Sequence, residues 1–277
     1  MSVFPFAING YAWTMSHDAP AFLRRMAERG WPAVELMVYP GHLWPATLDP
    51  GARRDLRRLV ERQGLRLVSL NMPNLDINLA AAAPEMRRHT LGLLHGVLEL
   101  AGDLEVPGVV IGPGKANPLM PAPPDELKGH FFRALDELAP HAARLGTSLY
   151  VENMPFAFLP RADQLMAALD GYGDPAIRVI YDLANAHFAG EDPKEGLRRV
   201  ADRLALVHLS DTGTDVYRHA PIGIGTVPFE GVPAVLEEVG YRDLPMFEIV
   251  ADDPEQAVVE GAARLAARGW PERATRP

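Results

Sequence analysis

The fold is decided by residues 147–153, which read TSLYVEN, an apolar run that ends in Glu152 and an asparagine. Buried strands rarely hold a lone charge, because taking an ionised group out of water is costly. The same pattern recurs towards the C-terminus as IRVIYD at 177–182, LALVHL at 204–209 and PMFEIV at 245–250. The titratable residues at or near the ends of these runs are Asp182, His208 and Glu248. They follow Glu152 at spacings of 30, 26 and 40 residues, about one strand and one helix each.

Strand-like and helix-like segments alternate along the whole chain. The predicted strands cover residues 3–9, 33–38, 66–71, 108–112, 147–153, 177–182, 204–209 and 245–250. The amphipathic segments between them lie at residues 18–29, 50–63, 84–102, 124–145, 161–170, 193–203, 229–239 and 254–268. Eight strand–helix units over about 250 residues fit a closed parallel (β/α)8 barrel. We therefore predict an α/β fold with a single TIM-barrel domain over residues 1–277.

An open, doubly wound sheet is the alternative fold. Such a sheet usually carries a glycine-rich phosphate-binding motif after its first strand, and NGYAW at 9–13 has none. The prolines of 113–124, PGKANPLMPAPP, exclude a helix or a central strand there. That stretch follows the fourth strand, so we expect it at the carboxyl end of the barrel, where active-site loops gather.

The composition excludes several classes of function. The chain has no cysteine, which removes thiol catalysis, disulfides and cysteine-bound zinc. Its formal net charge of −9 argues against a nucleic-acid partner. The N-terminal MSVFPFAINGYAW is no signal peptide, and no apolar run approaches the length of a membrane span. We therefore expect a cytoplasmic protein with no membrane partner.

The four titratable strand residues together predict a metal site. Any one of them alone would more often be a salt-bridged rim residue or a hydrogen-bonded core residue. In a barrel, however, the carboxyl ends of neighbouring strands converge, and two carboxylates about 4 Å apart repel by roughly 4 kcal/mol at an effective dielectric near 20. These strands hold no lysine to offset that repulsion, whereas a divalent cation would. Oxygen-rich ligation with one imidazole favours Mn2+, with Mg2+, Co2+ or Zn2+ as alternatives.

The motifs around these residues resemble those of the xylose isomerase-like barrels, a family that includes sugar-phosphate isomerases, ketose 3-epimerases, inosose dehydratases and endonuclease IV. The matching pieces are YVEN (Glu152), YDLAN (Asp182), VHLSDT (His208) and MFEI (Glu248). The resemblance covers nearly the whole chain. It implies that these four residues hold the metal and that the two glutamates also form the acid–base pair. Family members are often dimers or tetramers, so both a monomer and a homo-oligomer stay open.

The expected activity is that of a metal-dependent isomerase or epimerase acting on a small keto sugar or a related polyol ketone. The ion would chelate the carbonyl and a neighbouring hydroxyl oxygen and so stabilise an enediolate, while Glu152 and Glu248 move the proton. A dehydratase of the inosose or dehydroshikimate type is the first alternative, because the same enediolate can expel a β-hydroxyl.

An endonuclease IV-like DNA repair nuclease is a weaker alternative. Those enzymes use extra metal-binding histidines, and this chain has Asn71, Gly112 and Asn185 at the corresponding places. A non-catalytic sugar-binding barrel would not explain why so many ligand-type residues converge.

Further residues near the barrel mouth are candidates for substrate binding. They are Asn71, Asn185, Lys115 in GPGKANP, Arg218 in DVYRHAPIG, His187 in NAHFAG, and Trp13. A solvated loop lysine is an equally good interpretation of Lys115, and core packing is at least as good for Trp13. We also expect Asp211 to orient His208, since metal-bound imidazoles need such a partner. Glu35 is expected to accept hydrogen bonds behind the ligands.

Overall fold

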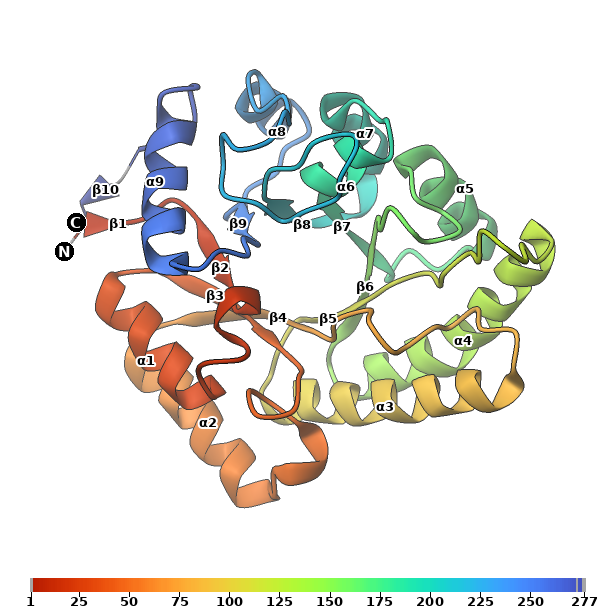
Figure 1. Cartoon of the computed structure of the whole chain (residues 1–277). Helices are drawn as coiled ribbons and strands as arrows, with labels where there is room; N and C mark the ends of the chain where they lie inside the picture. The colour runs from red at the N-terminus through yellow and green to blue at the C-terminus, as the bar shows by residue number, and fades with distance from the viewer. Residues whose placement is uncertain (1, 273, 276–277) are drawn as a thin grey trace.

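The computed structural model describes residues 2–272 and 274–275, and within them eight parallel strands form a closed barrel (Figure 1). The strands follow one another in chain order as β2 Ala7–Asn9, β3 Ala33–Met37, β4 Arg66–Asn71, β5 Gly108–Ile111, β6 Ser148–Glu152, β7 Arg178–Asp182, β8 Leu204–Leu209 and β9 Met246–Phe247. Pairing of β9 with β2 closes the ring. The predicted single-domain TIM barrel is therefore confirmed. Its predicted limits, residues 1 and 277, lie outside the described residues.

Helices form the outer layer, close to the places that the sequence predicts. They are α1 Ala19–Arg29, α2 Pro50–Gln63, α3 Pro84–Asp103, α4 Pro124–Arg144, α5 Ala162–Tyr172, α7 Pro193–Val200, α8 Val232–Glu238 and α9 Pro254–Ala266. Several are preceded by an aspartate whose carboxylate accepts a hydrogen bond from the first turn, and have a proline at their first or second position, as after Asp18, Asp49, Asp192 and Asp253. This is a strong start signal, because the carboxylate pairs a free N–H group and proline has none to pair. No helix in the described part of the chain is long and apolar enough to cross a membrane.

The interior of the barrel has two layers, one apolar and one polar. The apolar layer is a cluster of Ala7, Ala33, Val68, Val110, Ile180, Leu206 and Met246, with Tyr150 packed against it. Side chains in a strand return to the same face every second residue. Two positions beyond members of the apolar layer therefore come the buried polar residues Asn9, Glu35, Glu152, Asp182, His208 and Glu248. The polar layer faces the carboxyl end of the strands.

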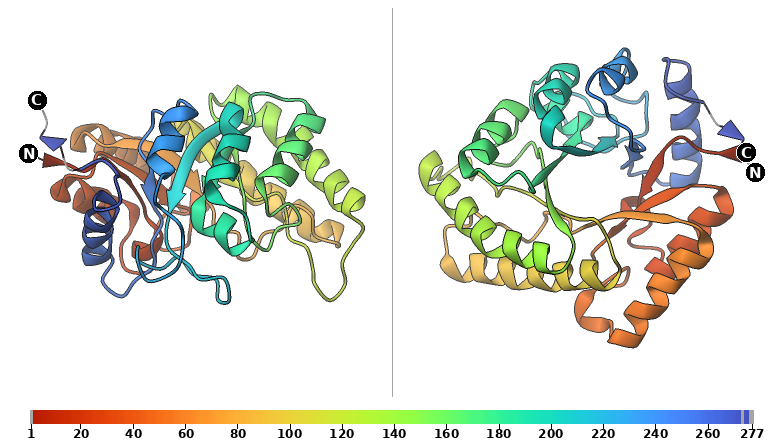
Figure 2. Two further views of the ribbon diagram at one scale, coloured as in Figure 1. Left: turned by 90° about the horizontal axis from the view of Figure 1, so that it is seen from above. Right: turned by 180° about the vertical axis from the view of Figure 1, so that it is seen from behind.

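The connections that follow the strands extend from the carboxyl end of the barrel (Figure 2, left). Residues 113–123, after β5, form no helix and only one isolated bridge, between Lys115 and Ala157, as their prolines predict. That bridge ties the connection after β5 to the connection after β6. These connections build the walls above the polar layer.

Three local predictions need correction. The expected first strand at 3–9 is interrupted at Pro5, which cannot donate a ladder hydrogen bond, so only 7–9 enter the barrel. Helix α6, Leu183–Phe188, is not among the elements predicted from the sequence. This helix begins directly at the end of β7 and is too short to show a helical period of apolar residues in the sequence. The segment 193–203 ends in a separate 3-10 turn, η3 Ala201–Arg203, instead of continuing as one helix. Two further short turns, η1 Tyr11–Trp13 and η2 Pro45–Thr47, lie in connections.

A small second sheet joins the two ends of the chain. Strand β1, Ser2–Val3, pairs antiparallel with β10, Ala274–Thr275, and both lie beside α9 (Figure 1). The right panel of Figure 2 shows this pair on the outside of the helical layer.

The packing of the barrel interior generates a stability prediction at Gly108. A methyl group there would meet the ring of Tyr150 at 2.2 Å, so Gly108→Ala should lower the free energy of unfolding by about 1–3 kcal/mol, the usual cost of overpacking. The matched control is Gly92→Ala in α3, where nothing lies within 4 Å of the added carbon. That change should raise stability by about 0.5–1 kcal/mol. Urea unfolding measures both, and equal effects would contradict the placement of Tyr150.

Candidate metal centre

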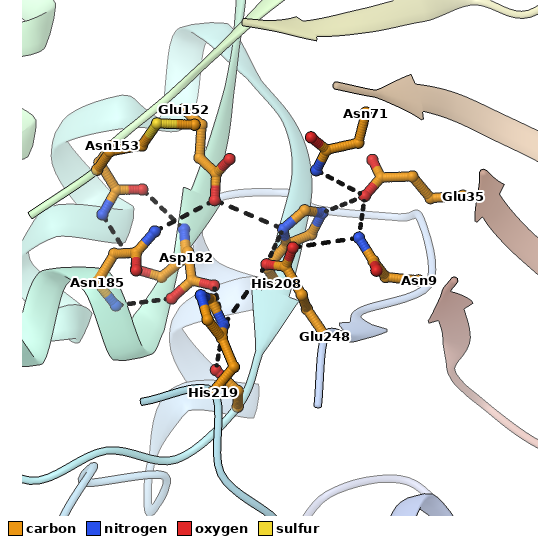
Figure 3. Close-up of polar contacts among 12 residues, drawn as sticks. Asn9, Glu35, Asn71, Glu152, Asn153, Asp182, Asn185, His208, His219 and Glu248 are labelled. Atoms are coloured by element: carbon orange, nitrogen blue, oxygen red, sulfur yellow. Dashed lines mark hydrogen bonds and ion pairs between the residues drawn. The ribbon is translucent and has the colours of Figure 1, made fainter. Parts of the chain in front are cut away.

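Four donor side chains meet in the polar layer of the barrel (Figure 3). Glu152 and Asp182 are the last residues of β6 and β7, His208 lies in β8, and Glu248 follows β9. One donor atom from each lies within 4.8 Å of the others. All four residues are buried. The convergence expected from the strand ends is therefore present.

His208 lies among carboxylates on both sides of its ring. Its Nδ1 is 3.0 Å from Oε2 of Glu248 and 3.7 Å from Oε1 of Glu152. Its Nε2 is 3.5 Å from Oε1 of Glu35. Within the described residues, neither Nε2 of His208 nor Oδ2 of Asp182 has a hydrogen-bond partner. A buried charged oxygen without a partner is costly, and a divalent cation among the four donors would remove that cost. The donor set thus fits a metal ion.

The pKa values of the cluster reflect the same crowding of charge. Burial raises the pKa of Glu152 to about 7. Burial, together with the Glu248 and Glu152 carboxylates, raises the pKa of Asp182 well above its usual value. Burial alone would lower the pKa of His208, but the Glu35 and Glu248 carboxylates raise it well above its usual value. Without a cation, the cluster therefore retains protons near neutral pH.

A second set of polar residues supports the donors from below. Glu35 accepts hydrogen bonds from Asn9, from Asn71 at 3.1 Å and from Ser69 at 2.5 Å. Asn9 also donates to Oε1 of Glu248 at 3.2 Å, so its amide links the two glutamates. The expected hydrogen-bond acceptor role of Glu35 is confirmed. Glu35, and not Asp211, is the carboxylate that lies beside Nε2 of His208.

The prediction for Asp211 is wrong. Its carboxylate accepts hydrogen bonds from the backbone N–H groups of Thr212, Gly223 and Val227. These bonds hold the long connection between β8 and α8, so the carboxylate is already occupied and does not orient His208.

Two asparagines hold Glu152 and Asp182 in place. Asn185 Nδ2 donates to Oε1 of Glu152 at 3.2 Å, and its backbone N–H donates to Oδ1 of Asp182 at 2.7 Å. Asn153 exchanges hydrogen bonds with the backbone of Asp182, at 2.8 and 3.0 Å. The start of α6 thus fixes both Asp182 and Asn185 beside the cluster.

A cavity of about 270 Å³ opens above the donors. Glu152 and Glu248 line it, and so do three of the predicted substrate contacts, Asn71, Lys115 and Asn185. The cavity therefore gives a small molecule access to two of the four donor residues and to three of the expected polar contacts.

The structure places the other three candidates outside this cavity. Trp13 is buried in the core and packs against Phe22. Nε2 of His187 lies 2.8 Å from the hydroxyl oxygen of Thr226. Arg218 is exposed and lines a different, outer depression formed by the connection after β8.

Tyr217 and His219, on either side of Arg218, do line the cavity. The Tyr217 hydroxyl lies 2.6 Å from Nε2 of His219 and donates to Oδ1 of Asn185 at 2.5 Å. His219 Nδ1 is 2.9 Å from the Ser210 hydroxyl and 3.7 Å from Oε2 of Glu248. Extended backbone sends alternate side chains to opposite sides. The alternation in YRH could have identified this pair, because it directs residues 217 and 219 to one side and Arg218 to the other.

Sequence comparison gives one family and several distant relatives. A family model described as xylose isomerase-like TIM barrel matches residues 23–268. An uncharacterised protein of Methanocaldococcus jannaschii is 25% identical over 226 residues, which cover 79% of this chain and 75% of that protein. An L-ribulose-5-phosphate 3-epimerase of Shigella boydii is 26% identical over 157 residues, 54% of this chain and 55% of the epimerase. The chain thus matches about half the length of that epimerase.

Solved structures with the same fold cover nearly the whole chain. A D-tagatose 3-epimerase-like protein has a TM-score of 0.79 at 20% identity, with 96% of this chain and 99% of that chain covered. The 3-keto-D-glucoside 4-epimerase of E. coli has a TM-score of 0.78 at 19% identity, covering 95% and 99%. An IOLI protein with a bound zinc atom has a TM-score of 0.78 at 17% identity, covering 98% and 99%. These likenesses show the fold.

The raised pKa of Glu152 generates a prediction about metal binding. Below about pH 7 this carboxyl holds a proton that an incoming cation must displace. Added Mn2+ should therefore raise the midpoint of thermal unfolding more at pH 8 than at pH 6. Asp182→Asn removes one donor oxygen but keeps an oxygen for the hydrogen bond to Asn185, so its Mn2+ shift should be smaller at both pH values. Equal wild-type shifts at pH 6 and pH 8 would contradict the prediction.

Proposed function

The chain belongs to the xylose isomerase-like TIM barrel family, and we propose that it is a divalent-metal-dependent epimerase or isomerase of a small keto sugar. One observation carries the proposal. Glu152 and Glu248 belong to the donor cluster and also line the cavity above it. Two carboxyl groups that reach both an ion and a substrate are what proton transfer beside a carbonyl requires.

The proposed ligands of the ion are Glu152, Asp182, His208 and Glu248. Mn2+ matches this oxygen-rich set best, with Mg2+, Co2+ or Zn2+ as alternatives. A divalent ion held there supplies Lewis acidity, which polarises a substrate carbonyl and makes the neighbouring C–H more acidic. In the described part of the chain, no second group of three or more such donors converges, so nothing supports the multi-metal chemistry of a DNA repair nuclease.

The two glutamates come to the cavity from opposite sides of the cluster. Glu152 ends β6 and Glu248 follows β9, with β7 and β8 between them. Burial raises the pKa of Glu152 to about 7. Burial also acts to raise the pKa of Glu248, but His208 and His219 lower it below its usual value. In the proposed reaction, one of the two glutamates removes the proton and the other returns it.

Hydrogen bonds keep the two carboxyl groups in place for this exchange. Asn185 holds Glu152 and Asn9 holds Glu248, each at 3.2 Å. We assign Asn71, Lys115 and Asn185 to substrate hydroxyl groups, because all three line the cavity. Return of the proton to the same carbon gives an epimer, and return to the neighbouring carbon gives an aldose–ketose isomer.

A dehydratase is the second candidate, and His219 is the observation that favours it. Elimination needs a proton donor for the departing hydroxyl. His219 lines the cavity and contacts the hydroxyl groups of Ser210 and Tyr217.

A keto-sugar and inosose panel separates the two reactions. We expect deuterium uptake from D2O at one carbon without a rise in ultraviolet absorbance, because an epimer or isomer contains no new double bond. An enone absorbance that appears with turnover and disappears in His219→Asn would support the dehydratase instead.

The acid–base assignment predicts the effect of two conservative substitutions. Glu152→Gln and Glu248→Gln should each lower kcat by at least about 100-fold, because an amide cannot exchange the proton. The measurements are product formation and deuterium uptake with Mn2+ present.

The matched control is Glu237→Gln on the exposed face of α8, which should leave kcat unchanged. Circular dichroism and bound-metal content check that each variant is folded and loaded. A folded, metal-loaded variant of either glutamate with near-normal kcat would contradict the assignment.

A further inference from the structure

We propose that the cavity is specific for an uncharged keto sugar and discriminates against its phosphate ester. The proposal rests on the proposed function and defines the substrate class of the same site. It follows from the charges that line the cavity, from the contacts of its one lysine, and from the apolar residues of its lining.

The charges in the cavity oppose a phosphate group. Its lining includes the acids Glu152 and Glu248, and Lys115 is the one permanent cation among the residues that form it. Both ring nitrogens of His219 already have partners, because Nδ1 lies 2.9 Å from the Ser210 hydroxyl and Nε2 lies 2.6 Å from the Tyr217 hydroxyl. Phosphate sites in proteins combine arginine or lysine side chains with backbone N–H groups at a helix start. The lining contains no arginine.

Lys115 is itself held by the protein. Its Nζ donates to the backbone oxygen of Leu75 at 2.5 Å, and burial lowers its pKa. Its backbone N–H donates to Oδ1 of Asn78 at 2.9 Å, and its bridge to Ala157 fixes the other side. The Leu75 carbonyl occupies one of the three N–H donors of the ammonium and leaves two, too few to match the oxygens of a dianionic phosphate without further cations. A single hydroxyl group can share the ammonium without further cations.

Among the residues that the structure describes, no other permanently cationic side chain lines the cavity. The short helix α6 begins beside the donors, but the N–H group of Asn185 in its first turn already donates to the carboxylate of Asp182. Arg218 lines the outer depression after β8, not the cavity. A phosphate group placed here would lose water without gaining the set of cationic partners that offsets this loss in phosphate sites.

Apolar residues form much of the remaining lining, here called the apolar wall. It includes Met37, Pro73, Leu75, Met154, Pro155 and Phe156. The Phe156 ring is 60% exposed, yet contacts position it: its centroid lies 5.5 Å from that of Tyr217 and 5.8 Å from that of Phe188, both edge-on. A positioned, exposed aromatic ring at a cavity mouth packs well against the C–H face of a sugar. The end of the substrate farthest from the ion would lie against this wall.

The test compares ketopentoses and ketohexoses with their terminal phosphate esters on the Mn2+-loaded protein. Both kcat/KM from turnover and Kd from calorimetry are measured for each pair. We expect at least a tenfold preference for the free sugar in both quantities. Lys115→Met should weaken the two members of a pair by similar factors, because the lysine contacts a hydroxyl group in either case.

A designed cation supplies the converse test. Leu75 is 54% exposed at the mouth, and Leu75→Arg places a guanidinium beside Lys115. This variant should improve kcat/KM for the phosphate ester relative to the free sugar by at least fivefold. Leu75→Gln, which has a polar side chain without charge, should leave that ratio unchanged. Thermal unfolding confirms that both variants are folded.

The outcomes separate this proposal from the proposed function. Turnover of phosphate esters in preference to free sugars, with selective loss in Lys115→Met, would overturn the specificity and leave the epimerase or isomerase proposal standing. Tighter binding of the free sugars without any turnover would support the specificity and count against the proposed function. Tighter binding of the phosphate esters would overturn the specificity whether or not turnover occurs.

Discussion

Mutual repulsion among buried carboxylates is the constraint on which this barrel depends. Glu152, Asp182 and Glu248 lie with His208 in a buried space where donor atoms from all four are within 4.8 Å of one another. Such a group is stable only when protons or a cation balance the charge. The supporting amides are placed accordingly, since Asn9 and Asn185 donate to glutamate oxygens. An uncharged amide donor fixes the position of a carboxylate without neutralising the negative charge that would attract a metal ion.

The two-residue period of the strands turns this constraint into a layered interior. The small and branched residues of the lower layer close the barrel beneath the donors, so solvent and substrate can approach only from the carboxyl end. Tyr150 completes that layer because Gly108 leaves room for its ring on the neighbouring strand. The apolar layer also lowers the local dielectric, which strengthens every charge interaction in the layer above it.

The barrel and the donor cluster could be predicted from the sequence because both depend on local patterns. Alternating apolar runs and helix start signals fix the elements, and a titratable residue in four successive runs marks the shared end. The cavity walls could not be predicted in the same way, because connections after different strands form them. Tyr217 and His219 enter the cavity through a bridge between Asp211 and Ala220 and a backbone bond from Val250 to His219. Arg218, chosen for its charge, points elsewhere for the same reason. Local patterns also fail where a single residue or a single turn decides the structure. Pro5 interrupts the expected first strand, and the six residues of α6 are too few to show a helical pattern.

Asp182 divides its two carboxylate oxygens between different partners. Oδ1 caps the first turn of α6 through the N–H of Asn185, while Oδ2 has no hydrogen-bond partner among the described residues. A cation that took both oxygens would leave the helix uncapped and loosen the asparagine that steadies Glu152. The cap thus leaves one oxygen of this carboxylate for an ion, whereas calcium commonly draws on both oxygens of a carboxylate. In the proposed centre, a helix cap would therefore influence which divalent ion binds.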